Sequence, residues 1–174
     1  DFAKELYLVR RRLEKRIAKQ QINGFYVCSL SFESIIYKGL FLAEQLSIFY
    51  PDLANEEFIS SFAVFHQRYS TNTFPSWGLA QPFRMLAHNG EINTISGNTN
   101  WMRNHQTRIT TEIFGDDSEQ VKPIIEKNVS DSSALDAAFE LYVRAGRSVP
   151  LVKTLLIPEA WSKRSELMPI EHRN

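Results

Sequence analysis

Two polar segments of the sequence, residues 66–73 and 88–93, contain side chains of the types used in acyl-transfer chemistry. In the second segment, Asn89 and Gly90 form a dipeptide typical of a tight hairpin turn. The same pair places a side-chain amide donor beside a backbone N–H that glycine leaves unobstructed, as an oxyanion hole requires. The pair therefore predicts either a simple turn or an oxyanion hole.

Arg68, at the end of an apolar stretch, is either a structural ion-pair partner or the ligand of a substrate carboxylate. The guanidinium group is suited to bidentate carboxylate binding. Thr71 and Thr73 follow closely enough to add hydroxyl donors to the same anion.

Asp131, flanked by Ser130 and Ser132, is either a helix cap or the ligand of a substrate ammonium group. Together, the arginine, the carboxylate and the two oxyanion donors would suit a zwitterionic amino-acid substrate. The residue pattern therefore favours an enzyme or binding site for an amino acid.

The residues alone do not identify a nucleophile. Cys28 alternates with Tyr26 and Leu30 on one face of a predicted strand, and free cysteines are commonly buried, so we expect it to pack in the core. The four histidines lack metal-ligand spacing; they are His66, His88, His105 and His172.

The hydrophobic pattern predicts the elements that position these residues. Spacings of four, three, four and four predict an amphipathic helix near the N-terminus, ended by Asn23-Gly24. Its expected apolar face is Phe2, Leu6, Val9, Leu13 and Ile17. Further helices are predicted at 42–50, 101–113, 131–142 with Ser130 or Asp131 as its cap, and 149–156, with a surface loop at 116–120. Strands are predicted at 24–30, 35–39, 62–66 and 84–88. Strands interspersed with helices favour an α+β domain.

Composition excludes several classes of protein. The 174 residues contain 20 Lys and Arg against 20 Asp and Glu, which argues against a nucleic-acid-binding domain. The run of six basic residues within 10–19 is interpreted as a solvated helix face. No apolar run approaches the length of a membrane span, and the start lacks the pattern of a signal peptide. A soluble segment that binds neither nucleic acid nor membrane is expected.

Several long motifs resemble the glutamine amidotransferase domain of the large subunit of glutamate synthases, a class II, N-terminal-nucleophile family. The central blocks are HQRYSTNTFPSW at 66–77, LAHNGEINT at 86–94 and GNTNWM at 97–102. Further blocks follow the family's order at 25–31, 37–39, 130–132 and 156–161, so the resemblance covers essentially the whole chain, 1–174, as one amidotransferase domain.

The resemblance implies a four-layer αββα sandwich, incomplete at both ends, and a set of site residues. It implies that Arg68 binds the α-carboxylate of L-glutamine, assisted by Thr71 and its neighbour Asn72. It also implies that the Asn89 side chain and the Gly90 N–H form the oxyanion hole, and that Asp131 holds the α-ammonium group. No metal site is expected.

The family's nucleophile is a cysteine at the mature N-terminus whose α-amino group is the general base, whereas this chain begins with Asp1. We therefore expect an internal fragment that lacks the nucleophile and is inactive by itself, with Cys28 not replacing it. The resemblance implies that glutamine hydrolysis supplies ammonia to a synthase domain of the same polypeptide, which forms glutamate from 2-oxoglutarate.

The resemblance also implies FMN, an iron–sulfur cluster and either a small electron-transfer subunit or ferredoxin in the full-length family, but no cofactor in this segment. The cytoplasm is the expected location, or a plastid in a photosynthetic eukaryote. The alternatives are a catalytically inactive glutamine-binding module and another class II amidotransferase, such as an amidophosphoribosyl or glucosamine-phosphate type. The blocks at 74–77 and 97–102 argue against the latter.

Overall fold

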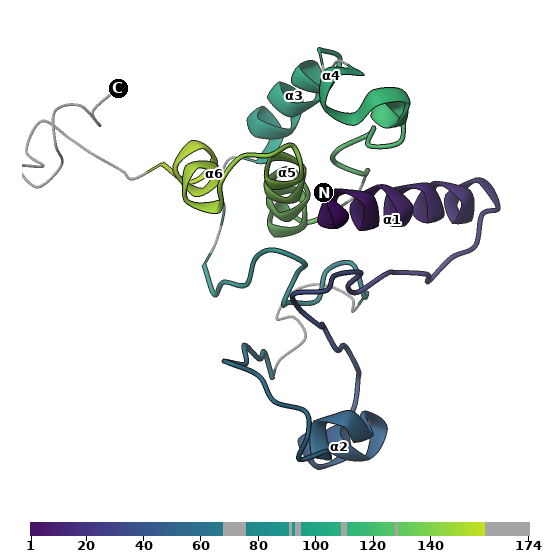
Figure 1. Cartoon of the computed structure of the whole chain (residues 1–174), viewed down its shortest axis with the longest axis vertical. Coiled ribbons are helices and arrows are strands. Elements are labelled where there is room, and N and C mark those ends of the chain that lie inside the picture. The colour runs from purple at the N-terminus through teal and green to yellow at the C-terminus, as the bar shows by residue number, and fades with distance from the viewer. Residues whose placement is uncertain (68–75, 91, 93–94, 109–110, 128, 159–174) are drawn as a thin grey trace, which may run out of the picture.

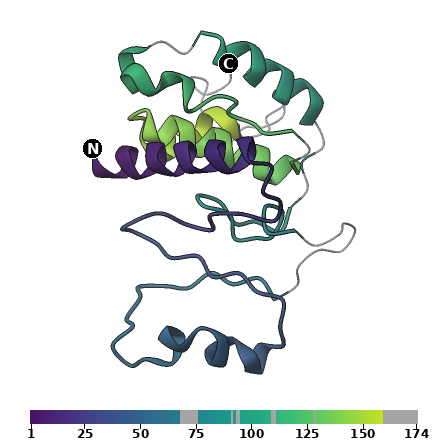
Figure 2. The same cartoon turned by 90° about the vertical axis from the view of Figure 1, so that its right-hand side faces the viewer.

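The computed structural model describes residues 1–67, 76–90, 92, 95–108, 111–127 and 129–158 (Figure 1). The α-helices are α1 (Phe2–Lys19), α2 (Leu46–Phe49), α3 (Ile95–Gln106), α4 (Thr111–Phe114), α5 (Asp131–Arg144) and α6 (Val149–Leu156). The 3-10 helices are η1 (Ala43–Gln45), η2 (Pro51–Ala54) and η3 (Gly115–Glu119). Helices α1, α3, α5 and α6 gather at one end of the molecule, and α2 lies at the other, beyond irregular extended segments (Figures 1 and 2).

The helices follow the sequence predictions closely at some ends and differ at others. The bounds of α6 are those predicted, and the Ser130 side chain caps α5 by accepting the Ser133 N–H at 3.1 Å. The predicted helix at 42–50 is divided into η1 and α2, and that at 101–113 into α3, which begins earlier, and α4. Gly115 ends α4 with a φ of +57°, but the predicted loop that follows is η3.

None of the four predicted strands is present among the described residues. A strand needs a neighbouring backbone to bond its N–H and C=O groups. Here side chains take that place: the Ile36 N–H donates to Ser29 Oγ at 3.1 Å across the bend that joins 24–30 to 35–39. The apolar residues of the third predicted strand face solvent, with Phe62 78% and Phe65 85% exposed. The strand predictions were therefore wrong for these residues, and the layered sandwich is not seen in them.

The core lies between α1, α5 and the segment that follows α4. Its buried members are Tyr7, Leu8, Phe114, Val121, Ile124, Ile125, Ala134 and Leu141. The predicted apolar face of α1 is not this buried face: Phe2 is 59% and Val9 50% exposed. The prediction failed because two charged residues, Arg10 and Arg11, occupy the buried side of the helix.

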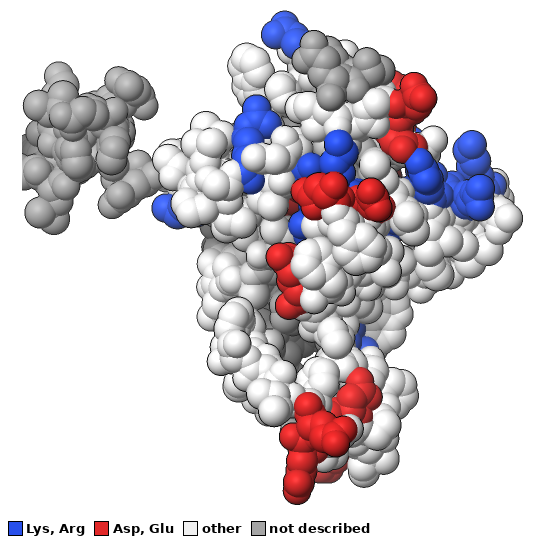
Figure 3. Space-filling model, viewed as in Figure 1, with Lys and Arg blue, Asp and Glu red and all other residues white. Residues whose placement is uncertain are grey.

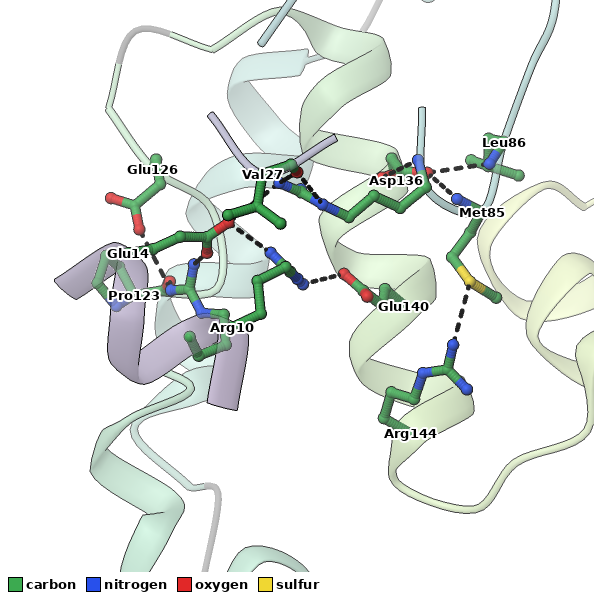
Figure 4. A network of polar contacts seen from close by, with 12 residues as sticks. Arg10, Glu14, Val27, Met85, Leu86, Pro123, Glu126, Asp136, Glu140 and Arg144 are labelled. Carbon is green, nitrogen blue, oxygen red and sulfur yellow. Dashed lines mark hydrogen bonds and ion pairs between the residues drawn. The ribbon is translucent and has the colours of Figure 1, made fainter. Parts of the chain in front are cut away.

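Both arginines are buried with partners. Arg10 forms ion pairs with Glu14 at 2.7 Å and with Glu140 of α5, and Arg11 pairs with Glu14 at 3.0 Å (Figure 4). A third arginine, Arg84, reaches the same Glu14 carboxylate at 3.0 Å and donates to the Val27 carbonyl at 2.7 Å. One carboxylate on α1 thus joins three arginines from two separate parts of the chain.

The segment containing Arg84 is fixed a second time by Asp136 of α5. The Asp136 carboxylate accepts three consecutive backbone N–H groups: Arg84 at 3.2 Å, Met85 at 2.8 Å and Leu86 at 2.9 Å (Figure 4). Asp136 is 2% exposed, and this burial raises its pKa, against the opposing effect of the Met85 N–H. Residues 84–86 are therefore fixed against α5, and this fixes the direction in which the chain continues to residues 88–90.

We predict that the charge state of Glu14 makes folding sensitive to acid. Burial by itself would raise the pKa of Glu14, but Arg10 and Arg84 outweigh it, and the net pKa is lowered. Its stabilisation is therefore present above the unfolded pKa of about 4.3 and is lost as the pH falls through that value towards the lower folded pKa. Glu14→Gln should reduce stability at neutral pH and weaken its acid dependence.

Thermal unfolding followed by circular dichroism, between about pH 3 and pH 7, measures this change. The exposed Glu56 provides the matched control, since Glu56→Gln should retain the wild-type profile. Identical acid dependence in Glu14→Gln and the wild type would contradict the assignment.

Asp136→Ala should release residues 84–86 from α5. Each buried N–H that loses its acceptor costs about 1–3 kcal/mol, and three donors are affected. Asp136→Asn should be milder because one side-chain oxygen can still accept the Met85 and Leu86 N–H groups. Amide hydrogen exchange at residues 84–86 reports the release directly, and wild-type exchange in Asp136→Ala would show that the carboxylate is not the anchor.

Candidate functional site

The N-terminus of α5 presents Asp131 beside the capping residue. Ser130, not Asp131, supplies the cap, so the cap interpretation of Asp131 is not needed. Asp131 Oδ1 accepts the Ser132 N–H at 2.8 Å, and its Oδ2 accepts no hydrogen bond from the described residues. A half-buried carboxylate at this place can accept a hydrogen bond from a substrate ammonium group.

A hydrogen bond to a side chain stabilises the bend at residues 88–90. The Gly90 N–H donates to His88 Nδ1 at 3.1 Å. A tight hairpin turn at Asn-Gly would give these residues a positive φ. The residues with positive φ in the described part of the chain are Gln21, Gly24, Gly115 and Gly146, so Asn89 and Gly90 do not form such a turn. Both residues are exposed, which leaves the Asn89 amide and the Gly90 backbone open to a ligand.

The imidazole of His88 connects this bend to α5. Its Nε2 lies 2.7 Å from Ser132 Oγ, while the His88 backbone N–H donates to Gln81 Oε1, also at 2.7 Å. The structure therefore places Asn89 and Gly90 near the N-terminus of α5, where Asp131 lies. Arg68, Thr71 and Asn72, the other predicted site residues, lie outside the described residues.

Sequence reasoning missed the residues that position the site. The sequence pattern does not indicate a positioning role for His88, and it singles out neither Asp136 nor Arg84. The available signal was the spacing of Ser132, Asp136 and Glu140, four residues apart and therefore on one face of α5. All three contact residues far from them in sequence.

Lys38 supports the loop that precedes the bend. Its ammonium group donates to the carbonyls of Trp77 at 2.9 Å and Ala80 at 2.7 Å, and lies 4.5 Å from the centre of the Tyr26 ring. Burial lowers the pKa of Lys38 to about 8. Lys38 therefore connects the 77–80 loop to the extended segment that carries Cys28.

Cys28 is half-buried rather than fully buried. Among the described residues, no group of three or more His, Cys, Asp and Glu side chains could hold a metal ion. The part of the chain that the structure describes also contains no helix long and apolar enough to span a bilayer.

Charge is separated along the surface. Arg12, Lys15, Arg16 and Lys19 of α1, together with Gln120, line a shallow hollow. Acidic side chains gather at the other end of the molecule, around α2 (Figure 3). The acidic end reflects the sequence, since residues 39–67 contain four acids and neither Lys nor Arg. The predicted solvated basic face is confirmed for the exposed Arg12, Arg16 and Lys19 but wrong for the buried Arg10 and Arg11.

The sequence model of the family described as class II glutamine amidotransferases matches residues 1–174. The large chain of NADPH glutamate synthase from Azospirillum brasilense is 58% identical over 172 residues, and that from Bacillus subtilis (strain 168) is 46% identical over 166 residues. The chloroplastic ferredoxin-dependent glutamate synthase of Spinacia oleracea is 44% identical over 169 residues.

These alignments cover 99%, 95% and 97% of this chain, but only 11%, 11% and 10% of the respective relatives. The chain therefore spans about a tenth of the length of the curated relatives it matches. Since the family model extends over every residue, the chain belongs to the class II glutamine amidotransferases.

Proposed function

We propose that the chain is the glutaminase part of a glutamate synthase, which hydrolyses L-glutamine to glutamate and ammonia for reductive transfer to 2-oxoglutarate. The observation that carries this proposal is the contact between His88 and Ser132, which brings the Asn89-Gly90 bend to the end of α5 that bears Asp131. We propose that the Asn89 amide, the Gly90 N–H and the Asp131 carboxylate bind the same zwitterionic amide substrate, because this contact brings the residues that carry them together.

Each site residue has a distinct role in this proposal. Asp131 accepts hydrogen bonds from the α-ammonium group of glutamine, and Arg68 binds its α-carboxylate with help from Thr71 and Asn72. The Asn89 side-chain amide and the Gly90 N–H donate to the oxygen of the side-chain amide as it becomes negatively charged. Opposite charges at the two ends of the amino-acid head group select glutamine over an uncharged amide.

The oxyanion donors act on the chemical step. A thiolate attacks the glutamine amide carbon, and the carbonyl oxygen becomes an oxyanion that Asn89 and Gly90 stabilise. Collapse of this intermediate releases ammonia and leaves a thioester, which water hydrolyses to glutamate through a second oxyanion. We propose that the thiolate comes from a cysteine outside these 174 residues and that Cys28 does not supply it.

The remaining components of a glutamate synthase lie elsewhere in this proposal. An iron–sulfur cluster needs several cysteine thiolates, and Cys28 is the only cysteine of the chain, so the cluster does not fit these residues. FMN, the synthase domain and the contact with an electron-transfer subunit or ferredoxin are likewise assigned to other segments. We also propose that the complete amidotransferase domain has the four-layer αββα sandwich, which the described residues do not form by themselves. The proposed location is the cytoplasm, or a plastid if the source is a photosynthetic eukaryote.

Substitutions should separate binding from chemistry in the full-length enzyme. Asn89→Ala should lower kcat by about 10²–10³-fold with a smaller change in KM, because one oxyanion donor is lost. Arg68→Ala and Asp131→Asn should chiefly raise the KM for glutamine, since each removes a contact to the head group. Steady-state glutaminase assays measure both, with Asp116→Asn on the exposed η3 as the control.

An affinity label tests the proposed reaction itself. The full-length protein should react with the glutamine analogue 6-diazo-5-oxo-norleucine at a cysteine outside this chain, and Arg68→Ala or Asp131→Ala should suppress the reaction. Peptide mapping by mass spectrometry locates the label, and Cys28→Ser should be labelled as efficiently as the wild type. Absence of label would favour an inactive glutamine-binding module, and a label on Cys28 would reassign the nucleophile.

A further inference from the structure

We propose that His88 is a positioning residue for the oxyanion hole: it orients the Gly90 N–H and is itself oriented by Ser132 of α5. This inference rests on the proposed glutaminase function, because it concerns the donor that the reaction would use. It adds a residue that the proposed substrate contacts do not include.

The two ring nitrogens of His88 have opposite roles. Because Nδ1 accepts the Gly90 N–H, it carries a lone pair, and the proton of the neutral ring is on Nε2. Nε2 therefore donates to Ser132 Oγ across 2.7 Å. The Gly90 N–H thus fixes the tautomer of His88, and the Ser132 hydroxyl, which can donate or accept, accommodates it by accepting from Nε2.

The imidazole forms a bridge between a fixed and an exposed part of the chain. The half-buried His88 is held by Gln81 through its own N–H, and residues 84–86 are held by Asp136, whereas Asn89 and Gly90 are exposed. Gly90 has the conformational freedom of glycine and gains no order from packing. The hydrogen bond to His88 Nδ1 therefore orients the Gly90 N–H, which packing contacts do not do.

The same bridge reaches the contact for the substrate ammonium group. Ser132, which binds Nε2 of His88 through its hydroxyl, donates its backbone N–H to Asp131 Oδ1 at 2.8 Å. Asp131, Ser132, His88 and Gly90 thus form one continuous series of hydrogen bonds. Because Asp131 and Ser132 are adjacent in α5, this series fixes the distance between the Asp131 carboxylate and the Gly90 N–H.

The strength of the acceptor suits a donor that is shared with a second acceptor during the reaction. The Gly90 bond is neutral and 3.1 Å long, near the upper end of the usual range. A hydrogen bond to a charged oxygen is about twice as strong as a neutral one. In the free enzyme the Gly90 N–H donates to His88 Nδ1, and as charge develops it is shared with the oxyanion, which is the stronger acceptor. Because the imidazole keeps the Gly90 backbone in one orientation throughout, its loss should lower kcat more than it changes KM.

Three substitutions at this position test the proposal in the full-length enzyme. In His88→Asn the side-chain oxygen lies where Nδ1 lies and can still accept the Gly90 N–H. In His88→Gln the amide reaches the position of Nε2 and Ser132 but not Gly90, and His88→Leu retains neither contact. His105→Leu, on the exposed side of α3, is the matched control.

We expect His88→Leu and His88→Gln to lower kcat by about tenfold or more, with KM for glutamine within about twofold of the wild type. His88→Asn should recover most of the lost kcat, and His105→Leu should match the wild type. Unchanged or raised kcat in His88→Leu, or equal losses in His88→Asn and His88→Leu, would overturn the positioning role.

Hydrogen exchange provides a readout that does not require activity. The Gly90 amide should exchange slowly in the wild type and His88→Asn, and faster in His88→Gln and His88→Leu, while residues 84–86 remain protected by Asp136. Equal exchange at Gly90 in all four proteins would refute the proposed contact even if every variant were less active. A wild-type enzyme without glutaminase activity would instead refute the proposed function, and with it the catalytic use of this contact.

Discussion

The arrangement of the site depends on one buried carboxylate, that of Asp136, which accepts the N–H groups of three consecutive residues. Three donors in a row face one side chain only if the backbone of 84–86 has a single orientation relative to α5. That orientation determines the direction in which residues 88–90 extend from α5. Without Asp136, the backbone N–H groups of 84–86 would lose their link to α5, and the contact between His88 and Ser132 would have to hold the segment against that helix.

The Glu14 cluster holds the same segment from the other side. Arg84 Nη2 donates to both Glu14 of α1 and the Val27 carbonyl, which also accepts from Arg84 Nε. The guanidinium carbon lies 4.5 Å from the centre of the Tyr26 ring. Arg10 pairs with both Glu14 and Glu140, which joins α1 to α5. Loss of either acid would leave Arg10 buried with fewer partners, a costly arrangement in a low-dielectric interior.

The features that could be predicted from the sequence are those determined by neighbouring residues. The cap at Ser130, the bounds of α6 and the end of α4 at Gly115 all depend on residues within one turn of the feature itself. The Asn89-Gly90 pair was identified for the same reason. The resemblance to a known family then supplied roles that no single residue type could establish.

The features that could not be predicted depend on distant partners. Arg10 and Arg11 resemble surface residues until Glu140 and the Pro123 carbonyl are brought to them. Strand formation likewise requires a second backbone, and residues 62–66 have the composition of a strand without being one here. The contact of His88 with Ser132 is the clearest case, because the two residues are 44 positions apart and their proximity arises only from the fold.

The burial of the Glu14 cluster also affects how dissolved ions influence the site. Mobile ions screen exposed charges over a distance of about 8–10 Å at physiological ionic strength, but they act much less on buried pairs. The pair of Arg12 and Asp117, with the arginine side chain about half exposed, is open to this screening, whereas Arg10 and Glu140 are enclosed. The Arg84–Glu14 pair that holds the 84–90 segment is less exposed than the Arg12–Asp117 pair, so salt should disturb the geometry of this segment less than it disturbs the surface pair.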